Sequence, residues 1–252
     1  MTNYIEKVHV SIIRIGLDKT IFRIIGYPIR KLRQYNKKRK IFGALDTEDK
    51  FTWIYNNNYW GNRESLSGSG STFEYTENLR NKIPELINKL SINIVLDAPC
   101  GDFNWMKYLL EKIDITYIGG DIVLPMIESN NKYYKNDKTT FVHIDLINDR
   151  FPAADLMICR DCLFHLSYKD IRSVLKNFID SNIPYILTST HINQSFKNKD
   201  IVTGDFRLID LFSSPFNLSP RTLFRIDDGC PPYTRQMCLW NRNQIIDCLK
   251  QF

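Results

Sequence analysis

Residues 93–103 read Asn-Ile-Val-Leu-Asp-Ala-Pro-Cys-Gly-Asp-Phe, and this stretch decides the fold. The apolar run at 94–96 is short enough for a buried strand and ends at Asp97. Pro99 and Gly101 then interrupt the regular backbone, and apolar residues resume at helical spacing over residues 105–112. The stretch therefore predicts a strand, a tight turn and a helix. In an open α/β sheet, such a turn lies where ligands bind.

Three further apolar runs, each ending on a charged residue, extend this pattern. They predict strands at 116–120, 140–144 and 155–159, which end at Asp121, at Asp145 and at the pair Arg160-Asp161. Asp121 follows Gly101 by 20 positions, the spacing of an acid that binds ribose hydroxyls. Any one of these acids would equally suit a helix N-cap. Acids at the ends of four successive strands favour a nucleotide-like ligand at one edge of the sheet.

The motifs Asp97-Ala-Pro-Cys-Gly101-Asp, Gly120-Asp121-Ile, Ile144-Asp145-Leu and Cys159-Arg-Asp161 resemble the cofactor motifs of class I S-adenosylmethionine (SAM)-dependent methyltransferases. The resemblance covers roughly residues 60–240. It implies an α/β Rossmann-like fold with a mostly parallel seven-stranded sheet, a C-terminal antiparallel hairpin and helices on both faces. Pro99 stands where the family usually has the first Gly of a Gly-x-Gly turn, so the turn departs from the family pattern.

The resemblance also implies a cofactor site. Asp121 would bind the ribose of SAM, Asp145 the adenine amine, and Asp97 with the Gly101 turn the methionine part. Arg80 suits the methionine carboxylate, and a solvent-facing position suits it equally. The residues expected around SAM, or around its product S-adenosyl-L-homocysteine (SAH), are Trp60, Arg80, Asp97, Ala98, Pro99, Gly101, Asp102, Phe103, Asp121, Ile122, Asp145, Leu146 and Arg160.

The acceptor would face another group of residues. Asp161 and His165 are four positions apart where a strand passes into a helix, and His191 ends a predicted strand at 184–190. These three are the catalytic candidates. His165 suits a general base because imidazole titrates near neutrality, although a purely structural role in its loop is the alternative. Tyr59, Ser67 and Arg207 are the substrate-binding candidates, with Arg207 suited to a phosphate or carboxylate.

The remaining chain predicts an extension, a lid and a loop around this domain. Residues 1–50 form a basic helical extension, and residues 51–252 form the methyltransferase domain. Aromatic residues beside a Ser/Gly-rich run suggest a lid at 51–80, and residues 191–220 suggest a long substrate loop. We also expect helices at 76–90, 125–134 and 168–180, and a hairpin formed by 223–227 and 236–240.

Charge and cysteine usage limit the partners and the compartment. The net charge of +6 comes from seven basic residues at positions 30–40, so the rest of the chain is nearly neutral and nucleic acid is not an expected partner. Residues 1–45 suit contact with a membrane surface or a protein, and equally a helix packed on the domain. The scattered cysteines and the absence of a signal peptide suggest the cytoplasm. Cys159-Arg-Asp-Cys162 lacks a second paired motif, so no metal site is expected.

The sequence therefore predicts a SAM-dependent methyltransferase that acts on an oxygen of a small polar acceptor. The wider pattern, including Trp60-Gly and Glu64-Ser-Leu-Ser-Gly, is similar to bacterial enzymes of surface-glycan tailoring that methylate capsular phosphoramidate. That resemblance implies a sugar, phosphate or phosphoramidate acceptor, or another glycan precursor, in capsular polysaccharide biosynthesis. Two alternatives stay open: an NAD-dependent oxidoreductase, and a non-catalytic protein of the same fold that binds a partner.

Overall fold

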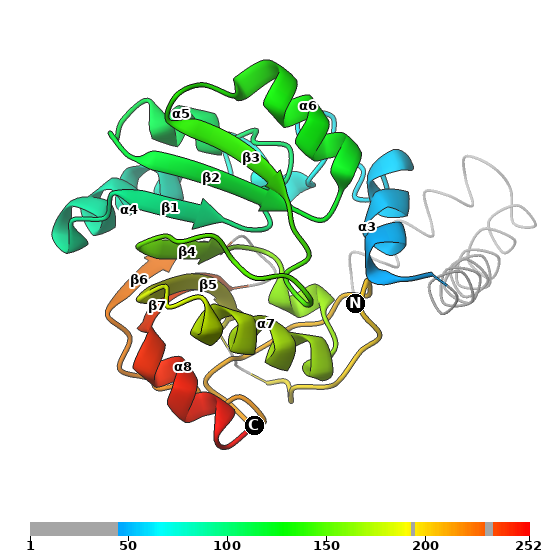
Figure 1. Cartoon of the computed structure of the whole chain (residues 1–252). Helices are drawn as coiled ribbons and strands as arrows, with labels where there is room; N and C mark the ends of the chain where they lie inside the picture. Colours follow the sequence, from blue (N-terminus) through cyan, green and yellow to red (C-terminus); the bar gives the residue numbers. More distant parts are fainter. Residues whose placement is uncertain (1–44, 193–194, 230–233) are drawn as a thin grey trace, which may run out of the picture. The chain divides into compact units, whose positions relative to one another are not determined.

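A computed structural model of the chain describes residues 45–192, 195–229 and 234–252 (Figure 1). The chain falls into two compact units, Met1–Asp46 and Thr47–Phe252, and nearly all of the described residues belong to the second. The basic segment expected to contact a membrane or a protein lies almost wholly outside the described residues. Within the described ranges, no helix has both the length and the apolar character needed to cross a bilayer.

The second unit is built on one seven-stranded sheet. Its strands are β1 (Ile94–Asp97), β2 (Thr116–Asp121), β3 (Thr139–His143), β4 (Leu156–Cys159), β5 (Tyr185–His191), β6 (Phe224–Asp227) and β7 (Arg235–Asn241). Their order across the sheet is β3-β2-β1-β4-β5-β7-β6. The first five strands are parallel, whereas β7 is antiparallel to both of its neighbours. The predicted sheet and its C-terminal hairpin are therefore confirmed.

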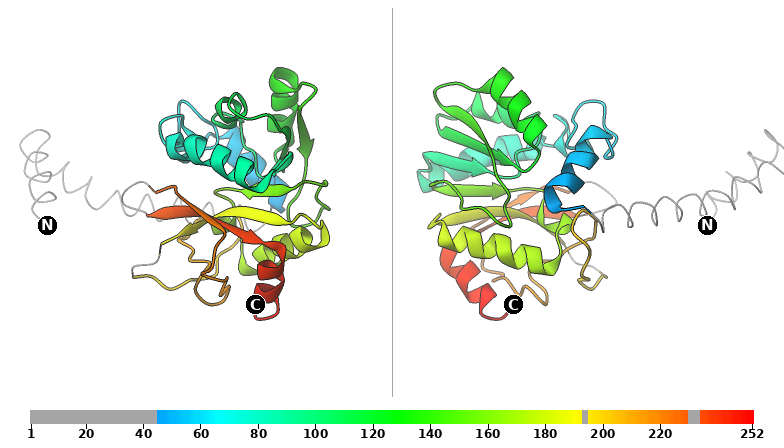
Figure 2. Two further views of the ribbon diagram at one scale, coloured as in Figure 1. Left: turned by 90° about the vertical axis from the view of Figure 1, so that its left-hand side faces the viewer. Right: turned by 45° about the vertical axis from the view of Figure 1, so that its right-hand side comes forward.

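Helices cover both faces of this sheet (Figure 2). They are α3 (Thr47–Asn56), α4 (Glu77–Leu90), α5 (Met106–Leu110), α6 (Leu124–Tyr134), α7 (Tyr168–Asp180) and α8 (Arg242–Leu249), with short 3-10 turns η1 (Ser69–Ser71) and η2 (Leu163–His165). Alternate strand residues enter separate cores: Val95 and Leu187 pack with α4, α5 and α6, while Leu96 and Ile186 pack with α7 and α8. Burial on both faces explains why these strands read as continuous apolar runs.

Three elements differ most from the sequence prediction: one unexpected helix, one shorter helix and one strand that ends earlier. Helix α3 was not expected, because its 10 residues bury a single side chain, Ile54, and so show little apolar periodicity. Helix α5 is shorter than the predicted 105–112, and β3 ends at His143, so that Asp145 lies two residues beyond the strand. The carboxyl ends of β1, β2, β4 and β5 are here called the carboxyl edge. Asp97, Asp121 and His191 lie at these ends, and Arg160 directly follows β4.

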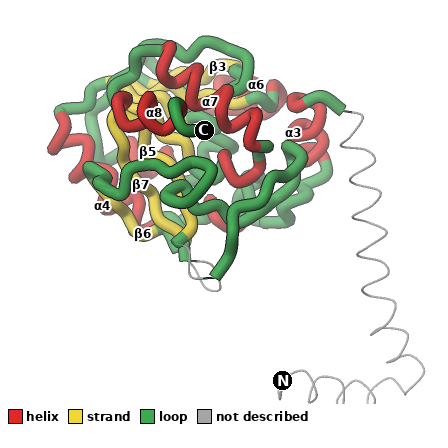
Figure 3. The backbone as a smooth tube through the Cα atoms, turned by 90° about the horizontal axis from the view of Figure 1, so that it is seen from below, coloured by secondary structure: helices red, strands yellow, loops and turns green. Residues whose placement is uncertain are grey.

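The long connection between β5 and β6 has no helix or strand in its described part, and Figure 3 draws it as loop. It is nevertheless packed: Ile209, Leu211 and Phe216 are fully buried in the core on the α7 side. The indole of Trp240 donates a hydrogen bond to the carbonyl of Ser219 (2.8 Å), which ties the loop to β7. The described part of this loop is therefore packed against the domain, and its Ile209 carbonyl accepts from the His191 amide (2.8 Å) at the end of β5.

Candidate active site

The turn after β1 is held between the neighbouring strands. The Ala98 amide donates to the Ile158 carbonyl (2.9 Å) and the Cys100 amide to the Gly120 carbonyl (2.8 Å). The Ala98–Pro99 peptide bond is cis. Gly101 has a φ of +58°, and its amide donates to the Asp121 carboxylate (3.0 Å). The turn and the end of β2 thus form one hydrogen-bonded unit at the carboxyl edge.

Asp97 and Asp121 are buried carboxyl groups at this unit. Tyr117 Oη donates to Asp97 Oδ2 (2.7 Å), and the Val123 amide donates to Asp121 Oδ1 (3.0 Å). Burial raises the pKa of Asp97 to about 7 and that of Asp121 to about 6. Two buried carboxyl groups with raised pKa values are typical of a site that binds a cationic or hydroxyl-bearing ligand.

The segment between α3 and α4, residues 57–76 and here called the α3–α4 segment, is fastened to this turn by Asp102. The carboxylate of Asp102 accepts hydrogen bonds from Ser65 Oγ (3.0 Å), the Leu66 amide (2.7 Å) and Ser67 Oγ (3.2 Å). The Asp102 amide donates back to Ser67 Oγ (3.0 Å). Asp102 and Ser67, expected on cofactor and substrate respectively, bind one another in this structure.

Gly101 leaves no room for a side chain, because a Cβ atom there would lie 2.2 Å from Ser67 Oγ. Replacing Gly101 with Ala should therefore displace the α3–α4 segment from the turn and weaken SAM binding by roughly tenfold or more. Gly61→Ala is the matched control, since Gly61 has a similar φ of +63° and open space around it. Calorimetry with SAM on both variants checks this. Equal affinities would mean that the close contact at Gly101 does not matter.

Several residues expected around the cofactor have local roles in the structure. Asp145 accepts from the Ile147 amide (2.8 Å) and from Asn148 Nδ2 (2.7 Å), closing its own turn. Leu146 is a core residue, and Ile122 offers its carbonyl to His143 Nε2 (2.9 Å). The Phe103 ring is buried against Tyr117, Tyr134 and Phe141.

Arg80 projects from α4 with unused donor capacity. Its Nη2 donates to the Phe73 carbonyl (2.7 Å), and its guanidinium carbon lies 3.5 Å from the centre of the Phe73 ring. Its Nε atom is buried without a hydrogen-bond partner among the described residues. An unpaired buried donor carries a free-energy penalty that an anionic group would remove, as the methionine carboxylate of SAM would.

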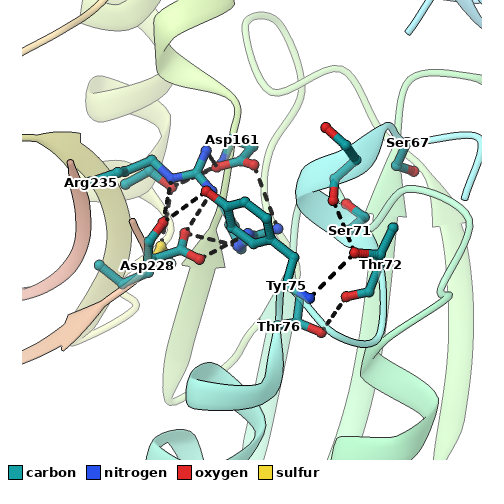
Figure 4. Close-up of polar contacts among 12 residues, drawn as sticks. Ser67, Ser71, Thr72, Tyr75, Thr76, Asp161, Asp228 and Arg235 are labelled. Carbon is teal, nitrogen blue, oxygen red and sulfur yellow. Dashed lines mark hydrogen bonds and ion pairs between the residues drawn. The ribbon is translucent and has the colours of Figure 1, made fainter. Parts of the chain in front are cut away.

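A buried ionic network joins β4 to the C-terminal hairpin. Asp228 pairs with Arg160 (2.9 Å) and Arg235 (3.1 Å), and Asp161 pairs with Arg235 (2.8 Å) and Arg160 (3.5 Å). Tyr75 Oη donates to the Asp228 carbonyl (3.1 Å) and accepts from Arg235 Nη2 (3.1 Å). Figure 4 shows Tyr75, Asp161, Asp228 and Arg235 turned toward one another. Arg160, expected on the cofactor, is thus engaged by two carboxylates.

This network sets the ionisation of Asp161. Burial alone would raise the pKa of Asp161, but the Arg160 and Arg235 guanidinium groups outweigh it and lower that pKa. Asp161 has a left-handed backbone (φ +53°), and its amide donates to Ser189 Oγ (3.0 Å). A Cβ atom on Gly70 would lie 3.0 Å from Asp161 Oδ2, so the α3–α4 segment passes directly over this carboxylate. Asp161 is therefore held as an anion beneath the α3–α4 segment.

Sequence reasoning missed Tyr75, Asp228 and Arg235. They lie in the α3–α4 segment and on either side of the connection between the two hairpin strands, far apart in the chain. The available signal was weak: an Arg at the start of an apolar strand and two consecutive acids at the end of its partner. The antiparallel pairing of β7 with β5 and β6 places Asp228 and Arg235 near the end of β4.

The two histidines at the carboxyl edge differ in accessibility and tautomer. His191 is buried, and its Nδ1 accepts from the Ile209 amide (3.2 Å). Burial, together with the charge of Arg235, lowers the pKa of His191 to about 4, so this ring is neutral at pH 7. His165 is less buried, and its Nδ1 bonds to the Asp205 carbonyl (2.8 Å). Since a carbonyl only accepts, Nδ1 of His165 carries a proton and neutral His165 has its lone pair on Nε2.

Arg207 fastens the loop after β5 to η2. Its amide donates to the Phe164 carbonyl (3.2 Å), and its Nη1 donates to the Leu166 carbonyl (2.6 Å). Burial lowers the pKa of Arg207.

Among the described residues, no three His, Cys, Asp or Glu side chains are grouped so as to hold a metal ion, and the described cysteines are free thiols.

Comparisons with known proteins bear on this site. Residues 95–181, about a third of the chain, match the model of a family described as a methyltransferase domain. No curated protein matches the chain. The match spans the turn after β1, Asp121, and the β4 end with His165, and so covers the carboxyl edge apart from the end of β5.

Solved structures show the same fold at low identity. A SAM-dependent methyltransferase from Leishmania major is 19% identical (TM-score 0.58; 80% of this chain and 89% of that chain). Human N-acetylserotonin methyltransferase with SAM is 16% identical (TM-score 0.51; 90% of this chain and 68% of that chain). Magnesium protoporphyrin IX methyltransferase from Synechocystis PCC 6803 with SAH is 11% identical (TM-score 0.51; 75% of this chain and 93% of that chain). These structures share the fold of this chain, and two of them hold SAM or SAH.

Proposed function

We propose that this chain, a SAM-dependent methyltransferase with the class I fold, methylates an oxygen of a small polar acceptor of the sugar, phosphate or phosphoramidate type in surface-glycan biosynthesis. The observation that carries methylation of a hydroxyl oxygen is the hydrogen bond from His165 Nδ1 to the Asp205 carbonyl. An alcohol must lose its proton as it is methylated, and this bond leaves the lone pair of His165 on Nε2, where it can accept that proton.

The residues of the carboxyl edge fit the cofactor. Asp97 offers a carboxylate for the ammonium group of SAM, Asp121 one for its ribose hydroxyls, and Arg80 an unpaired Nε for its carboxylate. Bound SAM supplies an electrophilic methyl group on sulfonium and becomes SAH when the acceptor oxygen takes that methyl. The chain itself positions the two molecules, excludes water and holds the released proton on His165.

The fixed network beneath the α3–α4 segment supports the same chemistry. Asp161 remains an anion between Arg160 and Arg235, so its negative charge favours the imidazolium form that His165 takes on after accepting the proton. His191, buried and neutral, orders β5 against the loop that presents Asp205. The catalytic candidates therefore divide into one proton acceptor, one fixed anion and one positioning residue.

Replacing His165 with Asn tests the base. The rate of methyl transfer should fall by about 10²–10⁴-fold, because Asn cannot accept the proton at neutral pH. Radiolabelled methyl transfer from SAM to a panel of sugars, sugar phosphates and phosphoramidates measures this, once one of them is found to be an acceptor. SAH affinity, followed by calorimetry, should stay unchanged. A variant with a rate within about threefold of the original would exclude His165 as the base.

A further inference from the structure

Aromatic side chains from three separate segments meet around His165. The Trp60 ring lies 5.6 Å from the His165 ring, and the Phe206 ring lies 5.8 Å from it on the loop after β5. Phe164 packs against both His165 (4.7 Å) and Phe206 (5.5 Å). The proposed base therefore lies in an aromatic surface formed by Trp60, Phe164, His165 and Phe206.

This surface is built by specific backbone contacts. The Gly204 amide donates to the His165 carbonyl (2.8 Å), and the Arg207 amide donates to the Phe164 carbonyl (3.2 Å), so the residues on either side of Phe206 are bonded to η2. On the other side, a Cβ atom on Gly68 would lie 3.3 Å from Trp60 Cβ, which shows how closely Trp60 packs on its own segment. The backbone around Phe206 and the base of the Trp60 side chain are thus packed against their neighbours.

Both outer rings are also accessible to solvent, Trp60 at 38% and Phe206 at 51%. They belong to a wider group: seven of the eleven large apolar side chains exposed in the described residues lie in the α3–α4 segment or between positions 192 and 206 of the loop after β5. These seven are Tyr59, Trp60, Leu66, Phe73, Ile192, Val202 and Phe206. Such a concentration of apolar surface beside one edge marks a binding surface rather than random exposure.

Arg207, on the same loop, is a buried cation. It donates to the Leu166 carbonyl (2.6 Å) and lies with its guanidinium carbon 5.3 Å from the Tyr168 ring, while its Nε and Nη2 have no hydrogen-bond partner among the described residues. The same loop also carries the acids Asp200 and Asp205. The exposed side chain that the loop presents beside His165 is therefore the Phe206 ring, which suits the apolar face of a ring better than a phosphate group.

We infer that the acceptor carries a hydroxylated six-membered ring that stacks an apolar face on Trp60 and Phe206 and directs a hydroxyl toward His165 Nε2. A pyranose presents C–H groups to an aromatic face and a phenol presents its π face, so both share this chemistry. The inference rests on the proposed function: a pyranose narrows its acceptor class to sugars, whereas a phenol would extend that class. Trp60, expected beside the cofactor, becomes a determinant of acceptor specificity.

Saturation-transfer NMR on the full chain with saturating SAH tests the inference. The probes are methyl α-D-glucopyranoside, catechol and, as an acyclic phosphate, glycerol 3-phosphate. Ring protons of at least one ring probe should receive saturation, and the signal should fall roughly fivefold or more in Trp60→Leu and Phe206→Leu. Tyr133→Leu is the control, because Tyr133 is an exposed aromatic residue (66%) near the end of α6.

The outcomes separate this inference from the function on which it rests. A signal from the pyranoside identifies a sugar acceptor, and one from catechol alone a phenolic acceptor; either supports the inference when both Leu variants lose it. Signals unchanged in both variants, or glycerol 3-phosphate binding without either ring probe, would overturn the inference while SAH still binds. Failure of SAH itself to bind in calorimetry would remove the proposed function and the inference with it.

Discussion

Replacing Asp97 with Asn should reduce SAM affinity by about 100-fold or more and, at the same time, stabilise the ligand-free protein above pH 7. The first effect arises because Asn cannot pair with the ammonium group of SAM, and loss of one partner from a buried ion pair is worth about 3–5 kcal/mol. The second arises because Asp97 is buried and its ionised form is desolvated.

The stability difference between Asp97→Asn and the original protein should depend on pH in a defined direction. Burial raises the pKa of Asp97 from 3.8 to about 7, so the folded state binds the proton more tightly than the unfolded state. The stability contributed by protonated Asp97 is complete below pH 3.8 and is lost as the pH rises through 7. The advantage of Asp97→Asn should therefore grow between about pH 4 and about pH 7 and then level off.

Thermal unfolding of the ligand-free proteins measures the stability effect. At pH 8 we expect Asp97→Asn to gain at least about 1 kcal/mol, a rise in Tm of roughly 2–4 °C for a domain of this size. Asp114→Asn is the control, since Asp114 is an exposed carboxylate paired with Lys138. A variant that loses SAM binding and is also less stable at pH 8 would show that Asp97 is structural and not held at the site for its ligand.

Replacing Asp228 with Asn should destabilise the protein by about 3–5 kcal/mol. Asn keeps the shape of the side chain but removes the charge that Arg160 and Arg235 share, and the Asp228 side chain is fully buried. Two guanidinium groups would then depend on Asp161 for their ion pairs within this network. Because the network joins β4 to β7, we expect the loss to appear as one cooperative decrease in stability.

Urea denaturation at pH 7 measures this decrease. Glu85→Gln is the matched control: Glu85 pairs with Lys82 on the exposed surface of α4, where an ion pair contributes about 0.5 kcal/mol or less. Tyr75→Phe reports separately on the α3–α4 segment, because it removes only the hydroxyl that bonds Arg235 and the Asp228 carbonyl. If the free energy of unfolding of Asp228→Asn were within about 1 kcal/mol of that of the original protein, the network would contribute little to stability.

The sheet was predictable because parallel strands buried on both faces leave a local pattern in the sequence. The apolar runs that end at Asp97, Asp121 and Cys159 correspond to β1, β2 and β4, and the alternation of Val95 and Leu96 between two cores explains why no polar residue interrupts them. The turn at Gly101 was predictable on similar grounds, since a single Gly between a strand and a helix marks a backbone that needs a positive φ.

Sequence reasoning could not supply the tertiary contacts between residues that lie far apart in the chain. Asp102 was expected on the cofactor, yet its carboxylate binds a segment 35 or more positions away in the chain. The ionic network unites positions 75, 160, 161, 228 and 235, which no local spacing brings together. The aromatic surface around His165 likewise depends on a loop with no periodic pattern. In each case the partners are fixed by sheet order and register, which only the folded chain determines.

Calorimetric titration of the purified full chain with SAM, SAH and NAD tests the assignment of the carboxyl edge as the cofactor site most directly. We predict that SAM and SAH both bind at micromolar concentrations, that NAD does not, and that Asp121→Ala abolishes binding of both SAM ligands. Asp121 bonds the amide of the Gly101 turn, and in the proposed site it also binds the ribose. Binding of NAD alone, or SAM affinity unchanged in Asp121→Ala, would contradict that assignment.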